Sequence, residues 1–133
     1  MIKLVTGGSG FIGSRLSSLL NSKGHKVRLL SRKNVDNYET VVCDLEKEEI
    51  PISALDSVDT IFHLAGYAHD LHDNHLNELR YKKINVHATV QLAKLAISAG
   101  VKQFIFISSI KAGGKALIGE CMTEEDQGNP EGI

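Results

Sequence analysis

The first thirteen residues constrain the fold more than any other part of the chain. The apolar run Ile2–Val5 is typical of a buried strand, and a cluster of glycines separates it from Phe11, where the apolar spacing becomes helical. The helical positions are Ile12, Leu16, Leu19 and Leu20. Glycines between a strand and a helix permit a tight turn close to a pyrophosphate, and the helix start offers free N–H groups to its phosphates. The segment therefore predicts a dinucleotide-binding turn.

The glycine spacing fits two patterns. Gly8, Gly10 and Gly13 fit GxGxxG, which many two-domain dehydrogenases carry. The second pattern, TGxxGxxG, begins at Thr6 with its glycines at Gly7, Gly10 and Gly13, and short-chain dehydrogenases/reductases carry it. Glycine turns also join strands to helices where no ligand binds, so the rest of the chain has to support the interpretation.

Composition places the chain among ordinary globular proteins with room for one core. It has 133 residues, of which 42% are hydrophobic and 23% charged. The net charge of −1 does not favour nucleic acid, no apolar run approaches the ~20 residues of a membrane span, and no secretory signal is visible. Cys43 and Cys121 lack metal or redox spacing, so we expect free thiols and a cytoplasmic location.

Strands and helices alternate along the chain. We expect strands at Ile2–Val5, Lys26–Leu30, Thr40–Cys43, Asp59–Ala65 and Gln103–Ser108, helices at Phe11–Lys23 and Asn77–Ala99, and a short helix or irregular crossover at Ile52–Leu55. The apolar stripe of the long helix comprises Leu79, Val86, Val90, Ala93 and Ile97. The last strand is apolar, as in a strand covered on both faces.

This alternation predicts an α/β fold, a doubly wound parallel sheet in three layers with the strand order 3-2-1-4-5. A ligand is expected at the carboxyl ends of strands one and four. We expect this domain to span residues 1–118 and to be followed by a polar loop at 119–133.

Several short segments, in this order and separation, resemble the extended short-chain dehydrogenase/reductase family, in particular its NAD(P)-dependent nucleotide-sugar epimerases and dehydratases. They are Thr6–Gly13, Cys43–Leu45, His63–Gly66, Asn85–Leu92 and Phe104–Ser109. The resemblance implies a Rossmann fold but covers only the N-terminal half of the family pattern. The cofactor contacts that it implies are Gly7, Ser9, Gly10, Phe11, Ile12, Gly13, Asp44, Leu45, Leu64, Ala65, Gly66, Asn85 and Ser108.

Two segments bear on the adenosine half of the cofactor. The resemblance assigns Asp44 and Leu45 to the adenine ring; Asp44 could also cap a following helix, and the two roles are compatible. The end of the second strand carries Ser31, Arg32 and Lys33, where NAD-binding proteins place an acidic residue. A guanidinium suits the 2′-phosphate of NADP, whereas the alternative is a solvated basic turn. We therefore expect NADP or NAD, with NADP preferred.

The chemistry of the family depends on a serine and a YxxxK pair. The resemblance assigns the catalytic serine to Ser109, which would hydrogen-bond the reacting oxygen of the sugar. The tyrosines Tyr38, Tyr67 and Tyr81 are followed four residues later by Val42, Leu71 and Asn85, so none has the lysine partner. We therefore expect an inactive N-terminal fragment of a parent enzyme, with the substrate-binding part missing. Separately, we expect the parent enzyme to form a homodimer.

Three functions remain open at this stage. The parent protein could epimerise or dehydrate a nucleotide sugar, it could be an NADPH-dependent carbonyl reductase, or the chain could be a non-catalytic NAD(P)-binding regulatory module. No metal site is expected: His69, His72 and His75 have helical spacing, but their segment reads as a polar loop. His63 is expected to be a buried, hydrogen-bonded strand residue rather than a catalyst.

Overall fold

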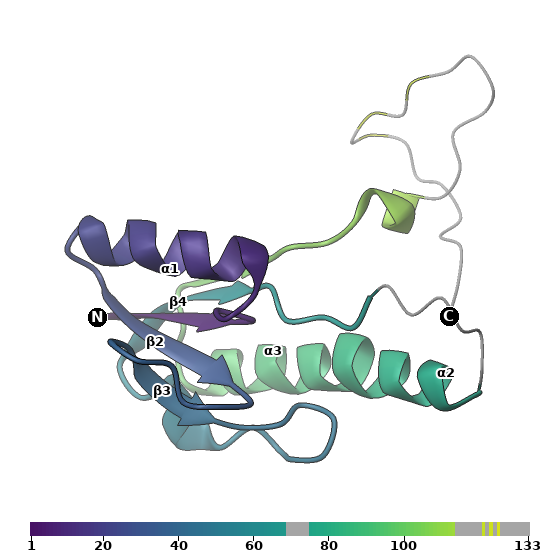
Figure 1. Ribbon diagram of the computed structural model, residues 1–133, viewed down its shortest axis with the longest axis horizontal. Helices are drawn as coiled ribbons and strands as arrows, with labels where there is room; N and C mark the ends of the chain where they lie inside the picture. Colours follow the sequence, from purple (N-terminus) through teal and green to yellow (C-terminus); the bar gives the residue numbers. More distant parts are fainter. Residues whose placement is uncertain (69–74, 114–120, 122, 124, 126–133) are drawn as a thin grey trace.

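The computed structural model describes residues 1–68, 75–113, 121, 123 and 125. Its centre is a parallel five-stranded sheet in the order β3-β2-β1-β4-β5 (Figure 1). The strands are β1 (Ile2–Thr6), β2 (Lys26–Ser31), β3 (Glu39–Val42), β4 (Val58–His63) and β5 (Gln103–Phe106). This order confirms the doubly wound Rossmann fold that the alternation of elements predicts.

Helices lie on both faces of the sheet and give the three predicted layers. α1 (Phe11–Ser22) covers one face, and α3 (Ala88–Ser98) covers the other (Figure 1). The sequence predicts either a short helix or an irregular crossover at Ile52–Leu55. The structure has the 3-10 helix η1 (Ile52–Leu55) there. Its Ala54 and Leu55 belong to the same buried cluster as residues of α3, so η1 and α3 share a face.

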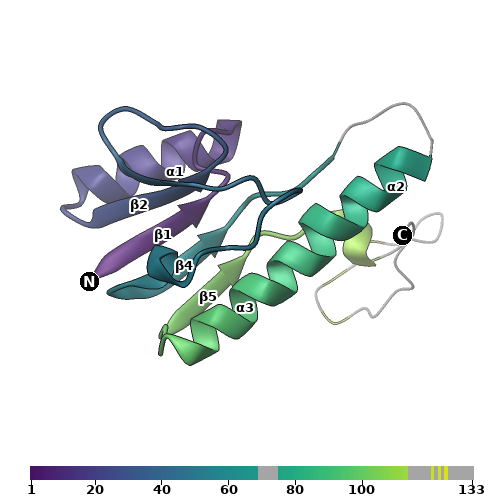
Figure 2. The ribbon, with the colours of Figure 1, turned by 90° about the horizontal axis from the view of Figure 1, so that it is seen from below.

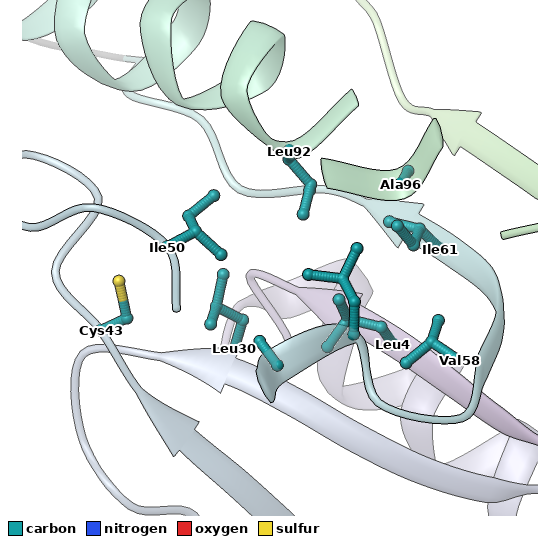
Figure 3. Packing of buried hydrophobic residues seen from close by; sticks show 10 residues of the cluster. Leu4, Leu30, Cys43, Ile50, Val58, Ile61, Leu92 and Ala96 are labelled. Carbon is teal, nitrogen blue, oxygen red and sulfur yellow. The ribbon is translucent and has the colours of Figure 1, made fainter. Parts of the chain in front are cut away.

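The core consists of two clusters, one on each face. Leu4 and Leu30 contribute to the larger cluster beneath α3, together with Leu92 (Figure 3). Their neighbours Val5 and Leu29 point to the other face, into a smaller cluster with Leu20 of α1. This alternation follows from the two-residue period of a strand, and it makes the central strands apolar on both faces.

The face of α1 that meets the sheet agrees only in part with the predicted one, since Leu20 packs against the core and Leu16 is half-buried. The buried residues of this helix are Gly13 and Ser17, whereas Ile12 and Leu19 are 59% and 55% exposed. A Cβ atom on Gly13 would lie 2.2 Å from the carbonyl oxygen of Gly7. Small residues therefore let the helix approach the turn closely, and its larger apolar residues lie beside that contact.

The predicted long helix is present but is not uniform. It starts at His75 and comprises α2 (His75–Tyr81), the π-helix η2 (Lys82–His87) and α3 (Figure 2). The predicted apolar stripe is wrong as a core face, because Leu79, Val86, Val90 and Ile97 are between 45% and 82% exposed. The buried positions are Ala88, Leu92 and Ala96, spaced by four, so the helix meets the sheet mainly through small residues.

β5 is shorter and more exposed than predicted. It ends at Phe106, and Ile105, Phe106 and Ile107 are between 37% and 49% exposed. β5 is an edge strand, and α1 lies over the other half of the sheet, so the described residues cover one face of β5 only (Figure 2). One further bond, from Ile107 N to His63 O at 3.0 Å, continues the pairing before the chain enters the 3-10 helix η3 (Ile110–Gly113).

Other boundaries shift by one or two residues. β4 ends at His63, so Leu64 and Ala65 follow the strand instead of belonging to it. Most of the predicted polar loop at 119–133 lies outside the described residues, and the domain boundary near residue 118 stays a prediction. Within the described part of the chain, no helix has the length and apolar content to cross a bilayer.

Candidate functional site

The candidate site lies between the carboxyl ends of β1 and β4. The chain leaves β1 towards β2 on one side and later returns to β4 on the other, so the loops after these two strands diverge. In open α/β sheets, ligands bind at this topological switch point. The glycine turn follows β1, and the segment Leu64–Gly66 follows β4, so the structure brings together the two segments with the most predicted cofactor contacts.

Gly7 and Gly8 have different structural roles, and this favours the TGxxGxxG alignment. Gly7 has a φ of +70°, and a Cβ atom on it would lie 2.8 Å from the backbone nitrogen of Ala65. Gly8 has no positive φ and is buried, and a Cβ there would lie 2.6 Å from the side chain of Leu29. Gly7 is therefore the turn glycine, and Gly8 packs against β2.

Gly10 has space that the protein itself does not use. Its φ of −78° and ψ of 177° are open to any residue, and a Cβ atom would find a single atom within 4 Å, the oxygen of Gly7 at 3.2 Å. A side chain here requires only a shift of a few tenths of an ångström between this Cβ atom and the oxygen of Gly7. The exposed space beside Gly10 fits the close approach of a pyrophosphate, as the cofactor interpretation requires.

The first turn of α1 is suited to an anion. Gly10 caps the helix without a side-chain hydrogen bond, and the first turn holds no acidic residue. Ser14 N donates to Gly10 O at 2.9 Å, so the backbone N–H groups that precede it in the helix are left for a ligand. Ser9, Phe11 and Ile12 are exposed around this turn, and the Arg15 guanidinium lies 3.9 Å from the centre of the Phe11 ring.

The segment after β4 is held by side chains from two other elements. Thr6 Oγ1 accepts a hydrogen bond from Ala65 N at 3.1 Å. Asn85 in η2 binds both backbone groups of Tyr67: its Oδ1 accepts from Tyr67 N at 2.7 Å, and its Nδ2 donates to Tyr67 O at 2.9 Å. The amide of Asn85, a predicted cofactor contact, is thus engaged with this loop, and Gly66 lies exposed beside it.

His63 is buried and hydrogen-bonded, as predicted. Its side chain is 0% exposed, and its two ring nitrogens contact Thr6 Oγ1 at 2.6 Å and Thr89 Oγ1 at 2.8 Å. Burial lowers the pKa of His63 from 6.5 to about 4, so the imidazole is neutral near pH 7. Nothing in the sequence marks the two threonines as partners of His63, although Thr6 opens the TGxxGxxG pattern.

The segment after β3 is a turn rather than a helix. Asp44 Oδ1 accepts from Glu46 N at 3.0 Å, and Asp44 Oδ2 lies 3.5 Å from Lys47 Nζ. Asp44 therefore does not cap a helix, the second role that the sequence allows, and its side chain stabilises a turn. Leu45 is half-buried beside it, and Glu46 pairs with Arg80 of α2 at 3.0 Å.

The remaining predicted site residues lie, like the glycine turn, at the carboxyl ends of the strands. Ser31 is the last residue of β2, and Arg32 and Lys33 follow it on the surface. Ser108 and Ser109 are exposed beyond the end of β5, where Ser109 O accepts from Ala112 N at 2.9 Å. Of the three histidines with helical spacing, His69 and His72 lie outside the described residues. Within the part of the chain that the structure describes, no three or more His, Cys, Asp or Glu side chains form a cluster that could hold a metal ion.

Comparison with known proteins identifies relatives over nearly the whole chain. The sequence pattern of the NAD-dependent epimerase/dehydratase family matches residues 3–132. The UDP-glucose 4-epimerase of Vibrio cholerae is 36% identical, and the match covers 96% of this chain and 41% of that enzyme. The 3-beta-hydroxysteroid dehydrogenase of Mycolicibacterium neoaurum is 33% identical, over 86% of this chain and 34% of that protein.

Solved structures agree with the sequence matches. MoeE5 in complex with UDP-glucose and NAD has a TM-score of 0.83 at 30% identity, over 98% of this chain and 43% of MoeE5. A short-chain dehydrogenase/reductase superfamily protein from Agrobacterium tumefaciens with bound NAD has a TM-score of 0.87 at 26% identity, over 99% of this chain and 40% of that protein. The chain thus spans less than half the length of each of these relatives. Because the strand order, the TGxxGxxG turn and the match over residues 3–132 agree, the chain belongs to the NAD-dependent epimerase/dehydratase family.

Proposed function

We propose that this chain is the dinucleotide-binding part of an NAD(P)-dependent enzyme that epimerises or dehydrates a nucleoside-diphosphate sugar. The observation that carries the proposal is the unused space beside Gly10 at the start of α1, at the switch point of the sheet. The 36% sequence identity to a UDP-glucose 4-epimerase and the structural similarity to MoeE5 with UDP-glucose and NAD support a nucleoside-diphosphate sugar as the substrate class.

Each predicted contact has a role in this proposal. The turn Gly7–Gly13, with Ser9, would bind the pyrophosphate through backbone N–H groups. Asp44 and Leu45 would bind the adenine ring, and Leu64–Gly66 would lie against the ribose and pyrophosphate at the nicotinamide end. Ser108 would face the cofactor, and Ser109 would donate a hydrogen bond to the sugar oxygen that reacts. A bound nicotinamide supplies the hydride acceptor, and the protein supplies position and proton transfer.

The proposed preference for NADP rests on the end of β2. Ser31 stands where an acidic residue would bind ribose hydroxyls, and Arg32 and Lys33 are exposed beside it. A guanidinium can bind the 2′-phosphate through two parallel hydrogen bonds. The structures of similar proteins named above contain NAD, so the choice between NADP and NAD needs a direct binding measurement on this chain.

A second candidate function is oxidation or reduction of a hydroxyl or carbonyl group on a steroid-like substrate. The similarity to the 3-beta-hydroxysteroid dehydrogenase of Mycolicibacterium neoaurum favours it, since that protein is 33% identical over 86% of this chain. Both candidates share the dinucleotide site. They are separated by assaying the product of the complete reading frame with UDP-sugars and with 3β-hydroxysteroids.

We also propose a cytoplasmic enzyme that forms a homodimer. Cys43 and Cys121 are free thiols, which suits a reducing compartment. The exposed apolar residues of the long helix, Leu79, Val86, Val90 and Ile97, form the kind of surface that packs against another protein. A second copy of the chain is the partner that we propose for it.

Isothermal titration calorimetry with NAD and NADP tests the cofactor proposal. The native chain should bind at least one of them. Gly10→Val places a branched side chain in the pyrophosphate space and should abolish binding while the circular dichroism spectrum stays native. Ser18→Val, on the exposed side of α1, is the matched control and should bind normally. Equal binding by Gly10→Val, or no binding by the native chain, contradicts the proposal.

A further inference from the structure

One chain of hydrogen bonds connects β1, β4 and the long helix through the ring of His63. Thr6 Oγ1 lies 2.6 Å from Nδ1, and Thr89 Oγ1 lies 2.8 Å from Nε2. Phe106 stacks on the imidazole with the ring centres 5.6 Å apart, and Phe104 lies at 6.1 Å. Water is excluded from the ring, since the exposed fraction of His63 is 0%.

The donor and the acceptor of each hydrogen bond in this series follow from the bonds at its two ends, to Asn85 O and from Ala65 N. Thr89 Oγ1 donates its single proton to Asn85 O at 2.9 Å, so it must accept a proton from His63 Nε2. The Nδ1 atom is then unprotonated and accepts from the hydroxyl of Thr6. The oxygen of Thr6 in turn accepts from Ala65 N at 3.1 Å. Each group is satisfied only when His63 is neutral with its proton on Nε2.

The residues at the two ends of this series of hydrogen bonds hold the loop that follows β4. Thr6 holds Ala65, and Asn85 holds Tyr67 through both of its backbone groups. Between them lies Gly66, and Gly7 approaches Ala65 so closely that a Cβ atom would be 2.8 Å from Ala65 N. Asn85 lies in the π-helix η2, a local widening that is frequent at functional sites.

We propose that His63 is a positioning residue for the dinucleotide site: as the Nε2-protonated imidazole it locks Thr6, and through Thr6 it holds the loop Leu64–Tyr67 against the glycine turn. The inference deepens the proposed function and rests on it, because the ligand that this loop would meet is the dinucleotide. His63 itself touches no ligand in this role.

Protonation of the ring takes the acceptor away from the hydroxyl proton of Thr6. A proton on Nδ1 would face the hydroxyl of Thr6, which would have to turn its own proton away from the ring. Among the described residues, the hydrogen-bond partners of the ring are Thr6 from β1 and Thr89 from the long helix, and its aromatic neighbours are Phe104 and Phe106 from β5. None of them is charged or titratable, so no carboxylate compensates an imidazolium there.

The two threonines can be tested separately from the fold. Thr6→Val removes both the donor to Nδ1 and the acceptor for Ala65, whereas Thr6→Ser keeps the hydroxyl. Thr89→Val acts from the far side of the ring, through the imidazole and through its own hydrogen bond to Asn85 O, so the tautomer of His63 has to be measured beside the exchange of Ala65. Thr60→Val is the matched control, because Thr60 is a 3% exposed threonine of β4 that binds Lys3 at 2.9 Å instead of the loop.

Nuclear magnetic resonance measures this lock, that is the tautomer of His63 and the hydrogen bond from Ala65 N to Thr6, without any ligand. The ¹⁵N shifts of His63 should show a proton on Nε2, and hydrogen exchange of Ala65 N–H should be slow. Both Thr6→Val and Thr89→Val should speed the exchange of Ala65, while Thr6→Ser and Thr60→Val leave it slow. A proton on Nδ1 in the native chain, or unchanged exchange of Ala65 in both valine variants, overturns the inference.

Calorimetry with NAD and NADP then measures the consequence for binding. Thr6→Val should weaken dinucleotide binding about tenfold, the scale of one buried hydrogen bond, and Thr6→Ser should restore it. If the native chain binds and Thr6→Val binds as well as Thr60→Val, the inference falls while the proposed function stands. If the native chain binds neither dinucleotide, the proposed function falls, and the exchange of Ala65 alone decides whether the lock exists.

Discussion

Gly7 and Gly10 are small for different reasons, and stability measurements can separate them. Gly7 has a φ of +70° and lies against Ala65, so Gly7→Ala should lower the free energy of unfolding by about 1–3 kcal/mol. Gly10→Ala has ordinary dihedrals and one contact at 3.2 Å, so its cost should be below about 1 kcal/mol. Urea denaturation measures both, and equal losses would contradict the assignment of Gly7 as the turn glycine.

Arg32 decides the cofactor preference if the end of β2 binds a 2′-phosphate. Arg32→Ala should weaken NADP binding by about 1–3 kcal/mol, the range for a charge-assisted hydrogen bond, and leave NAD binding nearly unchanged. Lys26→Ala, an exposed residue at the opposite end of β2, is the control. Tighter binding of NAD than NADP by the native chain would show that Arg32 and Lys33 form a solvated turn.

Single residues show where prediction from sequence ends. The TGxxGxxG pattern contains Thr6, but its partner His63 is 57 residues away, so no local period reports the contact. Asn85 was predicted from its motif as a cofactor contact, and its hydrogen bonds to Tyr67 depend on the π-helix, which has no signal in the hydrophobic spacing. The roles assigned to Ser109 and Asp44 stay predictions, because they concern contacts with a ligand.

The junction of β1, β4 and α3 should lose stability in acid. His63 has an ordinary pKa of 6.5 and a folded-state pKa of about 4, so the unfolded chain takes up its proton first as the pH falls. The stability that the neutral ring contributes is therefore complete above about pH 6.5 and is lost as the pH falls towards 4. The full loss is on the order of 3 kcal/mol.

This pH dependence can be assigned to one histidine. His63→Gln keeps a donor and an acceptor but does not titrate, so its free energy of unfolding should fall less than that of the native chain between pH 6.5 and 4. His25 and His87 are exposed and present in both proteins, so they serve as internal controls. Parallel stability curves for the two proteins would exclude His63 as the cause.

Among the elements, the order of strands was predictable and the buried faces of the helices were not. Alternating strands and helices with short connections leave few chiral topologies, and the sheet follows the predicted order. α1 and α3 meet the sheet through Gly13, Ser17, Ala88 and Ala96, which contribute little to a hydrophobic period. Close packing favours such small residues, so the large apolar side chains mark the buried faces only in part: Leu20 and Leu92 pack against the core, whereas Leu19 and Ile97 are exposed.

For the molecule as a whole, the exposed stripe on the long helix predicts association. Val90 is 47% exposed near the middle of the stripe, so Val90→Lys should prevent dimer formation without unfolding the chain. Light scattering coupled to size exclusion measures the mass, and Ser18→Lys on the exposed side of α1 is the control for added charge. A native chain that is monomeric at high concentration, or a Val90→Lys dimer, contradicts the homodimer proposal.

The 133-residue chain should bind a dinucleotide but show no turnover by itself. Removing hydride from a sugar alcohol requires a base that takes the hydroxyl proton, and a serine hydroxyl such as that of Ser109 stays protonated near pH 7. Tyr38, Tyr67 and Tyr81 lack the lysine four residues later that would lower a tyrosine pKa. Loss of general acid–base catalysis costs about 10²–10⁴ in rate, and loss of substrate orientation costs more.

Epimerisation of UDP-sugars should be assayed with this chain and with the product of the complete reading frame. We expect activity only in the latter, where Ser109→Ala should reduce kcat sharply while the affinity for the cofactor is largely kept. Ser98→Ala, at the exposed end of α3, is the matched control and should be fully active. Turnover by the 133-residue chain would contradict the prediction that it is inactive alone. Undiminished kcat in Ser109→Ala would remove Ser109 from the mechanism, because the hydroxyl would then not be needed to hold the reacting oxygen.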